Sequence, residues 1–278
     1  MTVTVQEKRA TFRALHAQGC FVLPNPWDVG SALMLQRMGF KALASTSSGH
    51  AWSQGLPDGA VSREVVLAHL RTLVEATDLP VNADFESGYA PDAEGVAASV
   101  RLAIETGVAG LSIEDATGDA GRPVRDISEA VDRLRAARAA IDEAGGDALL
   151  VGRAENFLFG RSDLADTIKR LQAYAEAGAD CLYAPGIRTR EQIAAVVTAV
   201  APKPVNLLIG STSEFALQDV AAMGVRRISV GGALARSAWG GFMRAAREIA
   251  ENGRFDGFAE AARGDELNAI FRGPACAG

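Results

Sequence analysis

Short apolar stretches recur eight times along this chain, and each is followed by a turn residue and then by a longer stretch with helical periodicity. This pattern is typical of β/α units, in which a buried strand alternates with an amphipathic helix. The expected strands are 21–25, 42–46, 81–85, 110–115, 149–155, 181–185, 205–210 and 226–231. Eight such units predict an α/β fold, a closed (β/α)8 barrel of the TIM type. A doubly wound open sheet is the rival fold.

The length of 278 residues and the 48% share of hydrophobic residues are sufficient for one barrel domain over residues 1–278. No low-complexity linker divides the chain. A helical tail is expected from about residue 248, and its helix at 258–271 exceeds what the barrel needs. This additional helix could cap the barrel or pack on another subunit.

Charge and cysteine content argue against several classes of protein. The net charge is -6, and there is no basic tract of the kind that nucleic acid binding requires. Cys20, Cys181 and Cys276 are odd in number and lack CxxC spacing, so neither a disulfide framework nor a zinc knuckle is indicated. The first residues lack the apolar core of a signal peptide, and no apolar run reaches membrane-spanning length. We therefore expect a cytoplasmic protein that binds neither nucleic acid nor membrane.

Acidic residues gather at the predicted carboxyl ends of two neighbouring strands, where barrel enzymes have their active sites. Alternation places Asn82, Asp84 and Glu86 on one face of the third strand, and Glu114 lies at the end of the fourth. Carboxylates brought together repel one another unless a cation or a bound proton compensates them, and oxygen ligands suit Mg²⁺ or Mn²⁺. The alternative is that each acid only caps a helix or pairs with Arg153.

Groups that could bind an anion follow two other predicted strands. Arg153, at the end of the fifth strand, could bind a substrate carboxylate through two hydrogen bonds and stabilise an enolate, or it could form a structural ion pair. Thr46, Ser47 and Ser48 offer hydroxyls and backbone amides as a carboxylate cradle, although a plain turn has the same composition. Trp27 follows the first strand and is close enough to the barrel mouth to shape the pocket.

Other kinds of barrel chemistry fit less well. A Schiff-base aldolase needs a lysine at the carboxyl end of a strand, and none of the four lysines falls there. The run 228–233 could form the phosphate site of a phosphosugar isomerase, but its glycines could equally permit close packing. His50 follows the cradle and is a candidate general acid, although a lone loop histidine is more often solvated.

Four motifs together resemble the isocitrate lyase and phosphoenolpyruvate mutase superfamily. They are GLPD at 55–58, NADFESGY at 82–89, IED at 113–115 and GRAE at 152–155. Each motif is short, but their order, spacing and strand-end positions span most of the barrel. The resemblance implies a Mg²⁺-dependent enzyme that acts on 2-oxo or 2-hydroxy carboxylates through an enolate. It also implies homo-oligomers, dimers or tetramers, that exchange a C-terminal helix, for which 258–271 is the candidate.

The resemblance also implies roles for individual residues. Asp84 would be the principal metal carboxylate, with Glu86 and Glu114 acting directly or through water, and Arg153 would hold the substrate carboxylate. Asp58 lies in the segment that resembles the family's gating loop, where it could contact the reacting group. Arg153, Asp58 and Glu114 are therefore the catalytic candidates. The substrate-binding candidates are Thr46, Ser47, Ser48, Arg153 and Trp27.

One departure from the superfamily narrows the expected reaction. Lyase members carry a loop with a proton-donating cysteine and a histidine after the strand-four acid, whereas residues 117–125 here read TGDAGRPVR. The usual Ser-Gly pair of the cradle is also replaced, by Thr46-Ser47. We therefore expect a lyase that cleaves a carbon-carbon bond of a small di- or tricarboxylate by decarboxylation or retro-aldol cleavage. The alternatives are a phosphonopyruvate-type hydrolase or mutase and a non-catalytic oxo-acid sensor.

Overall fold

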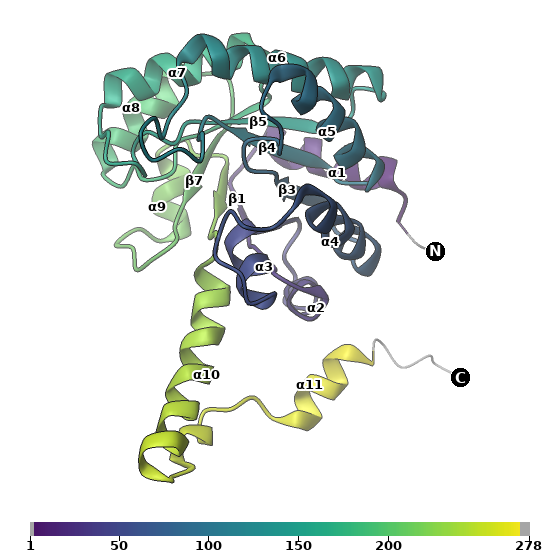
Figure 1. The fold of residues 1–278 in the computed structure, drawn as a ribbon, viewed down its shortest axis with the longest axis vertical. Helices are drawn as coiled ribbons and strands as arrows, with labels where there is room; N and C mark the ends of the chain where they lie inside the picture. The colour runs from purple at the N-terminus through teal and green to yellow at the C-terminus, as the bar shows by residue number, and fades with distance from the viewer. Residues whose placement is uncertain (1–2, 273–278) are drawn as a thin grey trace.

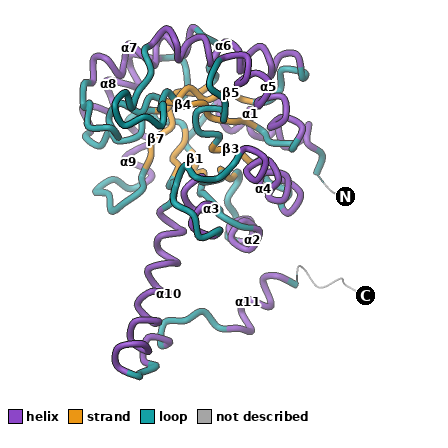
Figure 2. The backbone as a smooth tube through the Cα atoms, viewed as in Figure 1, coloured by secondary structure: helices purple, strands orange, loops and turns teal. Residues whose placement is uncertain are grey.

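The computed structural model describes residues 3–272, so Cys276 lies outside the described part of the chain. Eight parallel strands form one sheet at the centre of the molecule, and helices surround it (Figures 1 and 2). The strands are β1 (Phe21–Leu23), β2 (Leu43–Ala44), β3 (Val81–Asp84), β4 (Gly110–Glu114), β5 (Leu149–Arg153), β6 (Cys181–Tyr183), β7 (Val205–Leu208) and β8 (Arg227–Ser229).

The order of the strands closes the sheet into a nearly complete barrel. Each strand from β2 to β7 pairs with the next in sequence, and β8 pairs back with β1. The seam between β1 and β2 is bridged by a hydrogen bond of 3.1 Å from the Ala44 amide to the Pro24 carbonyl. A doubly wound sheet reverses its strand order partway across. The predicted (β/α)8 barrel is therefore confirmed and its rival excluded.

Helices alternate with the strands, as the sequence predicts. They are α1 (Val5–Ala17), α2 (Val29–Arg37), α3 (Ser47–Ser53), α4 (Arg63–Ala76), α5 (Ala93–Glu105), α6 (Ile127–Glu143), α7 (Leu164–Glu176), α8 (Arg190–Val200) and α9 (Leu217–Ala222). Side chains cap several of them: Asp28 accepts a hydrogen bond of 2.7 Å from the Ser31 amide at the start of α2. None of the helices in the described residues is long and apolar enough to cross a membrane.

The amino end of the barrel is sealed by apolar packing. Phe12 of α1 is fully buried there against Leu23 and Leu149. A Cβ on Gly110 would lie 2.9 Å from the Leu149 carbonyl oxygen and 3.0 Å from the Phe12 ring, so this position accepts only glycine without displacement. The amino end is thus closed, and the opposite end is left for the candidate site.

Most of the observed strands are shorter than the predicted ones, and they end earlier. The second strand, predicted over 42–46, ends at Ala44 because Thr46 becomes the N-cap of α3 and accepts a hydrogen bond from the Gly49 amide. The polar residues at the predicted strand ends therefore lie in the first turns of the loops, which places them over the barrel mouth.

An additional C-terminal helix is present, but the prediction of a helix over 258–271 is wrong for its first residues. Helix α10 (Ala233–Asn252) continues through residue 248, where the tail was expected to begin. A 3-10 turn, η1 (Asp256–Phe258), follows it. Helix α11 begins only at Gly264 and ends at Phe271. Residues 259–263 are exposed, so no packing supports a helix there, and short helices are marginal without it.

Candidate active site

A cavity of about 180 Å³ opens at the carboxyl ends of the strands. The predicted residues Ser47, Asp58, Asp84 and Arg153 all line it. The predicted cradle residues Thr46 and Ser48 line it as well. The other polar side chains in its wall are Asn25, Ser45, Asn82, Ser112, Tyr183, Arg227 and Ser229. The structure therefore brings together residues that lie far apart in the sequence.

Arg153 lies at the centre of the charged part of this site. One terminal nitrogen of its guanidinium is 3.1 Å from Asp84 Oδ1 and 3.3 Å from Glu114 Oε2. Its Nε donates a short hydrogen bond to Glu155. The guanidinium carbon also lies 5.1 Å from the centre of the Tyr183 ring, in a cation–π contact. Three carboxylates and one aromatic ring thus hold the Arg153 guanidinium in place.

Asp84 is held in place by the cradle predicted after the second strand. Its Oδ2 accepts hydrogen bonds of 3.1 Å from both the amide and the hydroxyl of Ser47. Its own amide donates to the hydroxyl of Ser45 at 2.9 Å. The hydroxyls of Thr46 and Ser48 lie 3.1 Å apart beside it. In this structure the cradle therefore orients an acid of the protein, while its remaining hydroxyls face the cavity.

Glu86 follows Asp84 in an unusual backbone conformation. Its φ of 46° and that of Tyr89, 52°, fall in the left-handed region that residues with a Cβ rarely adopt. The Tyr89 hydroxyl donates a hydrogen bond of 2.6 Å to Glu86 Oε1, which ties the two strained residues together. Strain of this kind persists only where the surrounding structure imposes it, and it is concentrated at functional sites.

Burial and mutual repulsion raise the pKa values of these acids. Burial raises the pKa of Glu114 well above its ordinary value, and although Arg153 opposes this, Glu155 and Asp84 add to it. Burial likewise raises the pKa of Glu86 and of Glu155. Asp84, Glu86, Glu114 and Glu155 bring four negative charges when ionised, and Arg153 supplies one positive charge. With all four acids ionised the site would carry an excess of negative charge, which either a bound proton, as the raised pKa values favour, or a cation would relieve.

The donor chemistry of the site fits a divalent metal, although no ready-made metal cage is present. Within residues 3–272, no three His, Cys, Asp or Glu side chains converge as a metal site. Arg153 lies between Asp84 and Glu114 and holds them as ion-pair partners instead. Carboxylate oxygens with excess negative charge are nevertheless the ligands that Mg²⁺ and Mn²⁺ prefer. Asp84 lines the cavity and is thus the best-placed candidate for a direct ligand, whereas Glu86 and Glu114, also predicted for the metal, are not among the residues that line the cavity.

Of two further predicted site residues, Asp58 lies at the cavity and Trp27 does not. Asp58, in the turn between α3 and α4, lines it. Partial burial and the charge of Asp84 raise the pKa of Asp58. Trp27 is not among the lining residues; it is half-buried and packs beneath α3, where a Cβ on Gly49 would lie 3.0 Å from the Trp27 Cβ. Trp27 therefore supports the cradle from behind.

The loop that replaces the lyase cysteine segment is held by its own hydrogen bonds. Ala116 and Val124 form an isolated antiparallel bridge, and the Thr117 amide donates to the Pro123 carbonyl at 3.0 Å. Arg125 pairs with Glu129 at 3.0 Å, which fixes the end of the loop to α6. The loop thus contains no thiol or imidazole and its polar groups are already paired, so a proton donor has to come from elsewhere.

The sequence analysis missed two acids that position Arg153. Glu155 lies two residues after Arg153, and the alternation of an extended chain could have indicated that the two share a face. Asp115 is 1% exposed and accepts hydrogen bonds from the Glu155 amide at 2.8 Å and the Tyr174 hydroxyl at 2.6 Å. It also pairs with Arg170 at 3.0 Å. This buried network fixes the end of β5. Nothing in the local sequence distinguishes Asp115 from an acid that only caps a helix.

Comparison with known proteins places the chain in a family. The family model of phosphoenolpyruvate phosphomutase matches residues 12–250. The chain is 30% identical over 230 residues to oxaloacetate decarboxylase from Paraburkholderia xenovorans (strain LB400), covering 80% of this chain and 74% of that protein. It is 36% identical over 168 residues to 2-methylisocitrate lyase from Escherichia coli (strain K12), covering 58% of this chain and 55% of that protein.

A solved structure with the same fold supports the same family assignment. A Burkholderia cenocepacia J2315 protein, described provisionally as a lyase or mutase, superposes with a TM-score of 0.94 at 47% identity, covering 97% of this chain and 98% of that one. The family model also extends over nearly the whole barrel. The protein therefore belongs to the phosphoenolpyruvate phosphomutase family, within the isocitrate lyase and phosphoenolpyruvate mutase superfamily.

Proposed function

We propose that this protein is a Mg²⁺-dependent lyase, with Mn²⁺ as a possible substitute, that cleaves a carbon-carbon bond of a small 2-oxo or 2-hydroxy di- or tricarboxylate through an enolate. The observation that carries the proposal is the position of Arg153, held among Asp84, Glu114 and Glu155 beside the Ser47 cradle. Relatives named as an oxaloacetate decarboxylase and a 2-methylisocitrate lyase support it.

Arg153 would bind the carboxylate next to the reacting carbonyl. Its Nε and one terminal nitrogen are held by Glu155, Asp84 and Glu114, so the other terminal nitrogen would donate to the substrate carboxylate, while Glu155 and the Tyr183 ring fix the orientation of the guanidinium. Because these contacts exist before the substrate arrives, little reorganisation is needed when negative charge develops on the substrate oxygen. The hydroxyls of Thr46 and Ser48 would donate to a carboxylate on the neighbouring side of the cavity.

Asp84 would hold the divalent cation directly, and Glu86 and Glu114 would hold its bound waters. When bound, the cation supplies positive charge next to the substrate oxygen that becomes negative. Asp84 is already oriented for this by the amide and hydroxyl of Ser47. The excess negative charge of the four acids would keep the cation in the site.

Asp58 is the residue that could return a proton to carbon. Burial and the neighbouring Asp84 raise its pKa, so its carboxyl holds a proton more readily at neutral pH than an ordinary aspartate does. After the carbon-carbon bond breaks, the bonding electron pair remains on the enolate. A proton transferred from the Asp58 carboxyl to the enolate carbon would complete the product. No residue of the 117–125 loop offers an equivalent donor.

Carbon-phosphorus chemistry is the second candidate, because the matching family model is that of a phosphomutase. The same Arg153 and acids would stabilise the enolate of pyruvate when a carbon-phosphorus bond breaks. Phosphonopyruvate therefore belongs in the assay panel, and release of phosphate from it, in preference to cleavage of oxo diacids, would favour this second candidate.

The test is turnover of oxaloacetate, related 2-oxo and 2-hydroxy diacids and phosphonopyruvate, with Mg²⁺ and after removal of metal by a chelator. We expect Mg²⁺-dependent release of a pyruvate-like product, and a loss of at least about 100-fold in kcat/KM for Asp84→Ala and for Arg153→Lys. Asp132→Asn, an exposed acid on α6, is the matched control and should retain activity. No metal-dependent turnover of any panel member would refute the lyase and favour an oxo-acid sensor.

A further inference from the structure

A second and larger cavity lies beside the candidate active site at the same end of the barrel. Its volume is about 510 Å³, compared with about 180 Å³ for the cavity that contains Arg153. The loops that follow β6, β7 and β8 form most of its wall. Leu208, Gly231 and Gly232 line both cavities. The two spaces are therefore neighbours that share a wall, which we call the inner and outer cavities.

The shared wall is thin because two of its residues have no side chain. Gly231 has a φ of 53°, and a Cβ there would lie 3.2 Å from Leu208 Cδ1. A Cβ on Gly232 would lie 2.8 Å from the Ser48 hydroxyl of the cradle. Leu208 is thus the side chain that controls the width between the inner and outer cavities.

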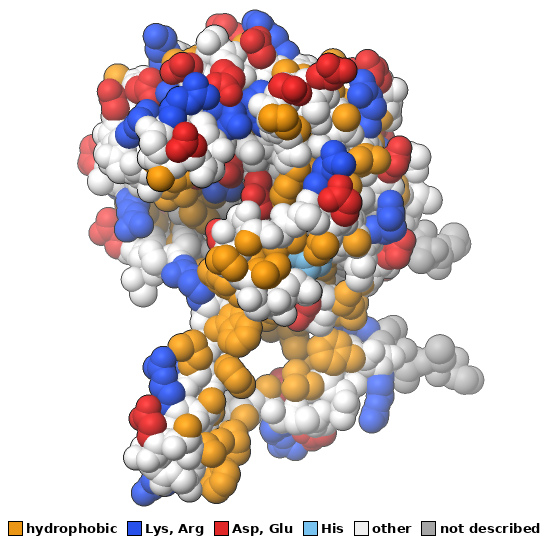
Figure 3. Space-filling view, in the orientation of Figure 1, with side chains coloured by type: hydrophobic (Ala, Val, Ile, Leu, Met, Phe, Trp, Pro, Cys, Tyr) orange, Lys and Arg blue, Asp and Glu red, His pale blue; other side chains and the backbone are white. Residues whose placement is uncertain are grey.

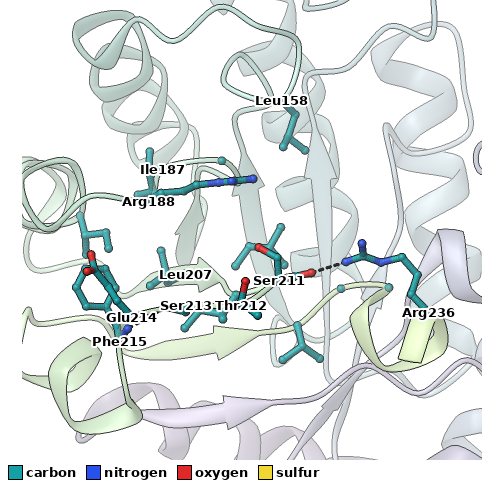
Figure 4. Close-up of a pocket in the computed structure, with 18 residues that line it drawn as sticks. Leu158, Ile187, Arg188, Leu207, Ser211, Thr212, Ser213, Glu214, Phe215 and Arg236 are labelled. Carbon is teal, nitrogen blue, oxygen red and sulfur yellow. Dashed lines mark hydrogen bonds between the residues drawn. The ribbon is translucent and has the colours of Figure 1, made fainter. Parts of the chain in front are cut away.

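The outer cavity combines an apolar floor with positive charge at its rim. Leu207, Ile187 and Val230 contribute apolar surface. Arg188 and Arg236 reach into the cavity from opposite sides (Figure 4). The pocket thus offers hydrocarbon contact along its length and a guanidinium at its far side, the surroundings that suit an apolar chain with an anionic end.

Arg188 is the cation of this cavity that is free to bind a ligand. Within residues 3–272 neither Arg188 nor Arg236 forms an ion pair, but the Arg236 guanidinium already donates a hydrogen bond to the Gly210 carbonyl, whereas the Arg188 guanidinium donates none there. Glu214 also lines the cavity, but Figure 4 shows its side chain beside Phe215, away from the Arg188 guanidinium. The Arg188 amide donates to Gln192 Oε1 at 2.8 Å, so its backbone is fixed while its charge is available.

We propose that the substrate is an extended acid whose reacting end binds at Arg153 and whose apolar middle occupies the outer cavity, with a distal anionic group bound by Arg188. The distal group is a carboxylate or another oxyanion, which the guanidinium fork recognises in the same way. This assignment rests on the proposed function, and it makes Arg188 a specificity-determining residue. A four-carbon oxo diacid would fill only the inner cavity.

Binding of unreactive probes tests the proposal independently of turnover. The probes are oxalate and a series of N-substituted oxamates, which mimic a 2-oxo acid and carry chains of increasing length ending in a carboxylate or its methyl ester. We expect calorimetry to show that affinity rises with chain length for the carboxylates and less for the esters. Arg188→Gln should weaken the long carboxylates about 10- to 100-fold and leave oxalate unchanged.

Two further variants make the result decisive. Arg135→Gln removes the same charge from an exposed arginine on α6. It should change neither the affinity for oxalate nor the affinity for the long probes. Thr212→Trp, on an exposed loop that lines only the outer cavity, should fill part of that cavity and weaken every long probe, with oxalate again unchanged. Equal affinities of long and short probes, or an equal effect of Arg188→Gln on oxalate, would overturn the proposal.

The two proposals fail separately. If oxaloacetate is turned over but chain length and Arg188 have no effect on binding, the outer site is refuted and the lyase stands. If no acid is turned over but the length dependence and the Arg188 effect are found, the lyase is refuted and the outer site stands as a binding site for extended acids.

Discussion

The three histidines of this chain, His16, His50 and His69, are buried or half-buried, so their ring nitrogens have little contact with water. The rings of His50 and His69 stack with centroids 3.7 Å apart and an angle of 11° between their planes. Neither ring nitrogen of His50 has a hydrogen-bond partner in the described residues. The expectation that His50 is a solvated loop residue or a general acid therefore does not fit its surroundings, since it packs between α3 and α4.

These histidines make stability depend on pH. Burial and the neighbouring His50 lower the pKa of His69 to about 4, and burial and Arg227 lower that of His16 to about 3. The unfolded chain takes up protons near pH 6.5, so it binds more protons than the native state below that pH. The contribution that neutral His16 and His69 make to the free energy of unfolding is thus complete above about pH 6.5. It is lost as pH falls toward 4, at up to about 1.4 kcal/mol per pH unit for each histidine.

We expect His69→Phe to reduce this loss, because phenylalanine keeps an aromatic ring on His50 without a titrating nitrogen. Urea unfolding at pH 7.5 and pH 5.0 would measure the difference in free energy of unfolding for both proteins. The buried acids, whose pKa values are raised, stabilise the native state as pH falls and so oppose the effect of the histidines. The pH dependence of the free energy of unfolding is therefore compared between the wild type and His69→Phe. Identical pH dependence of the wild type and His69→Phe would contradict the assignment.

At the scale of elements, the barrel is weakest where β1 meets β2. One backbone hydrogen bond bridges this seam, whereas the other strand pairs form regular ladders. Asn25 reinforces it: its Nδ2 donates to the Ser45 carbonyl at 2.8 Å, and its Oδ1 accepts from the Val230 and Gly231 amides at 2.9 Å each. One buried side chain thus ties together the ends of β1, β2 and β8 at the wall of the inner cavity.

Asn25→Ala should therefore open the seam. Three hydrogen bonds at about 1 kcal/mol each predict a loss of about 3 kcal/mol in the free energy of unfolding. The loss would be measured by chemical denaturation, with hydrogen exchange of the Val230 and Gly231 amides as a local probe. Asn252→Ala, an exposed amide at the end of α10, is the control and should be nearly neutral. A similar small effect for Asn25→Ala would show that the backbone alone closes the barrel.

At the scale of the whole molecule, α10 projects away from the barrel and only Ala235 of this helix is buried (Figure 1). Its apolar side chains are exposed: Trp239 is 38%, Phe242 62% and Met243 42% exposed. Figure 3 shows hydrophobic side chains gathered on this projecting part. Such a surface is characteristic of an interface. Helix α11 returns to pack on α2 of the same chain, where Phe271 approaches Gly30.

We expect the protein to form homo-oligomers through α10, in agreement with the superfamily resemblance. Phe242→Glu should weaken association by at least about 100-fold, because a central aromatic residue contributes several kcal/mol to such an interface. Light scattering after gel filtration over a dilution series would measure the state. Ser237→Glu introduces the same charge at an exposed position on the other side of α10 and is the control. A wild type that is monomeric at every concentration would refute the prediction, and exchange of α11 stays a separate prediction.

The barrel, and the end of it at which the polar groups meet, follow from the amino-acid pattern alone. Strand alternation and the common direction of parallel strands are local properties, and they were sufficient to place Ser47, Asp84 and Arg153 together. Only the tertiary structure decided that Glu155 and Asp115 orient Arg153, that His50 stacks on His69, and that an outer cavity adjoins the inner one. These features depend on loop paths and on distances between segments far apart in the chain, which no local pattern encodes.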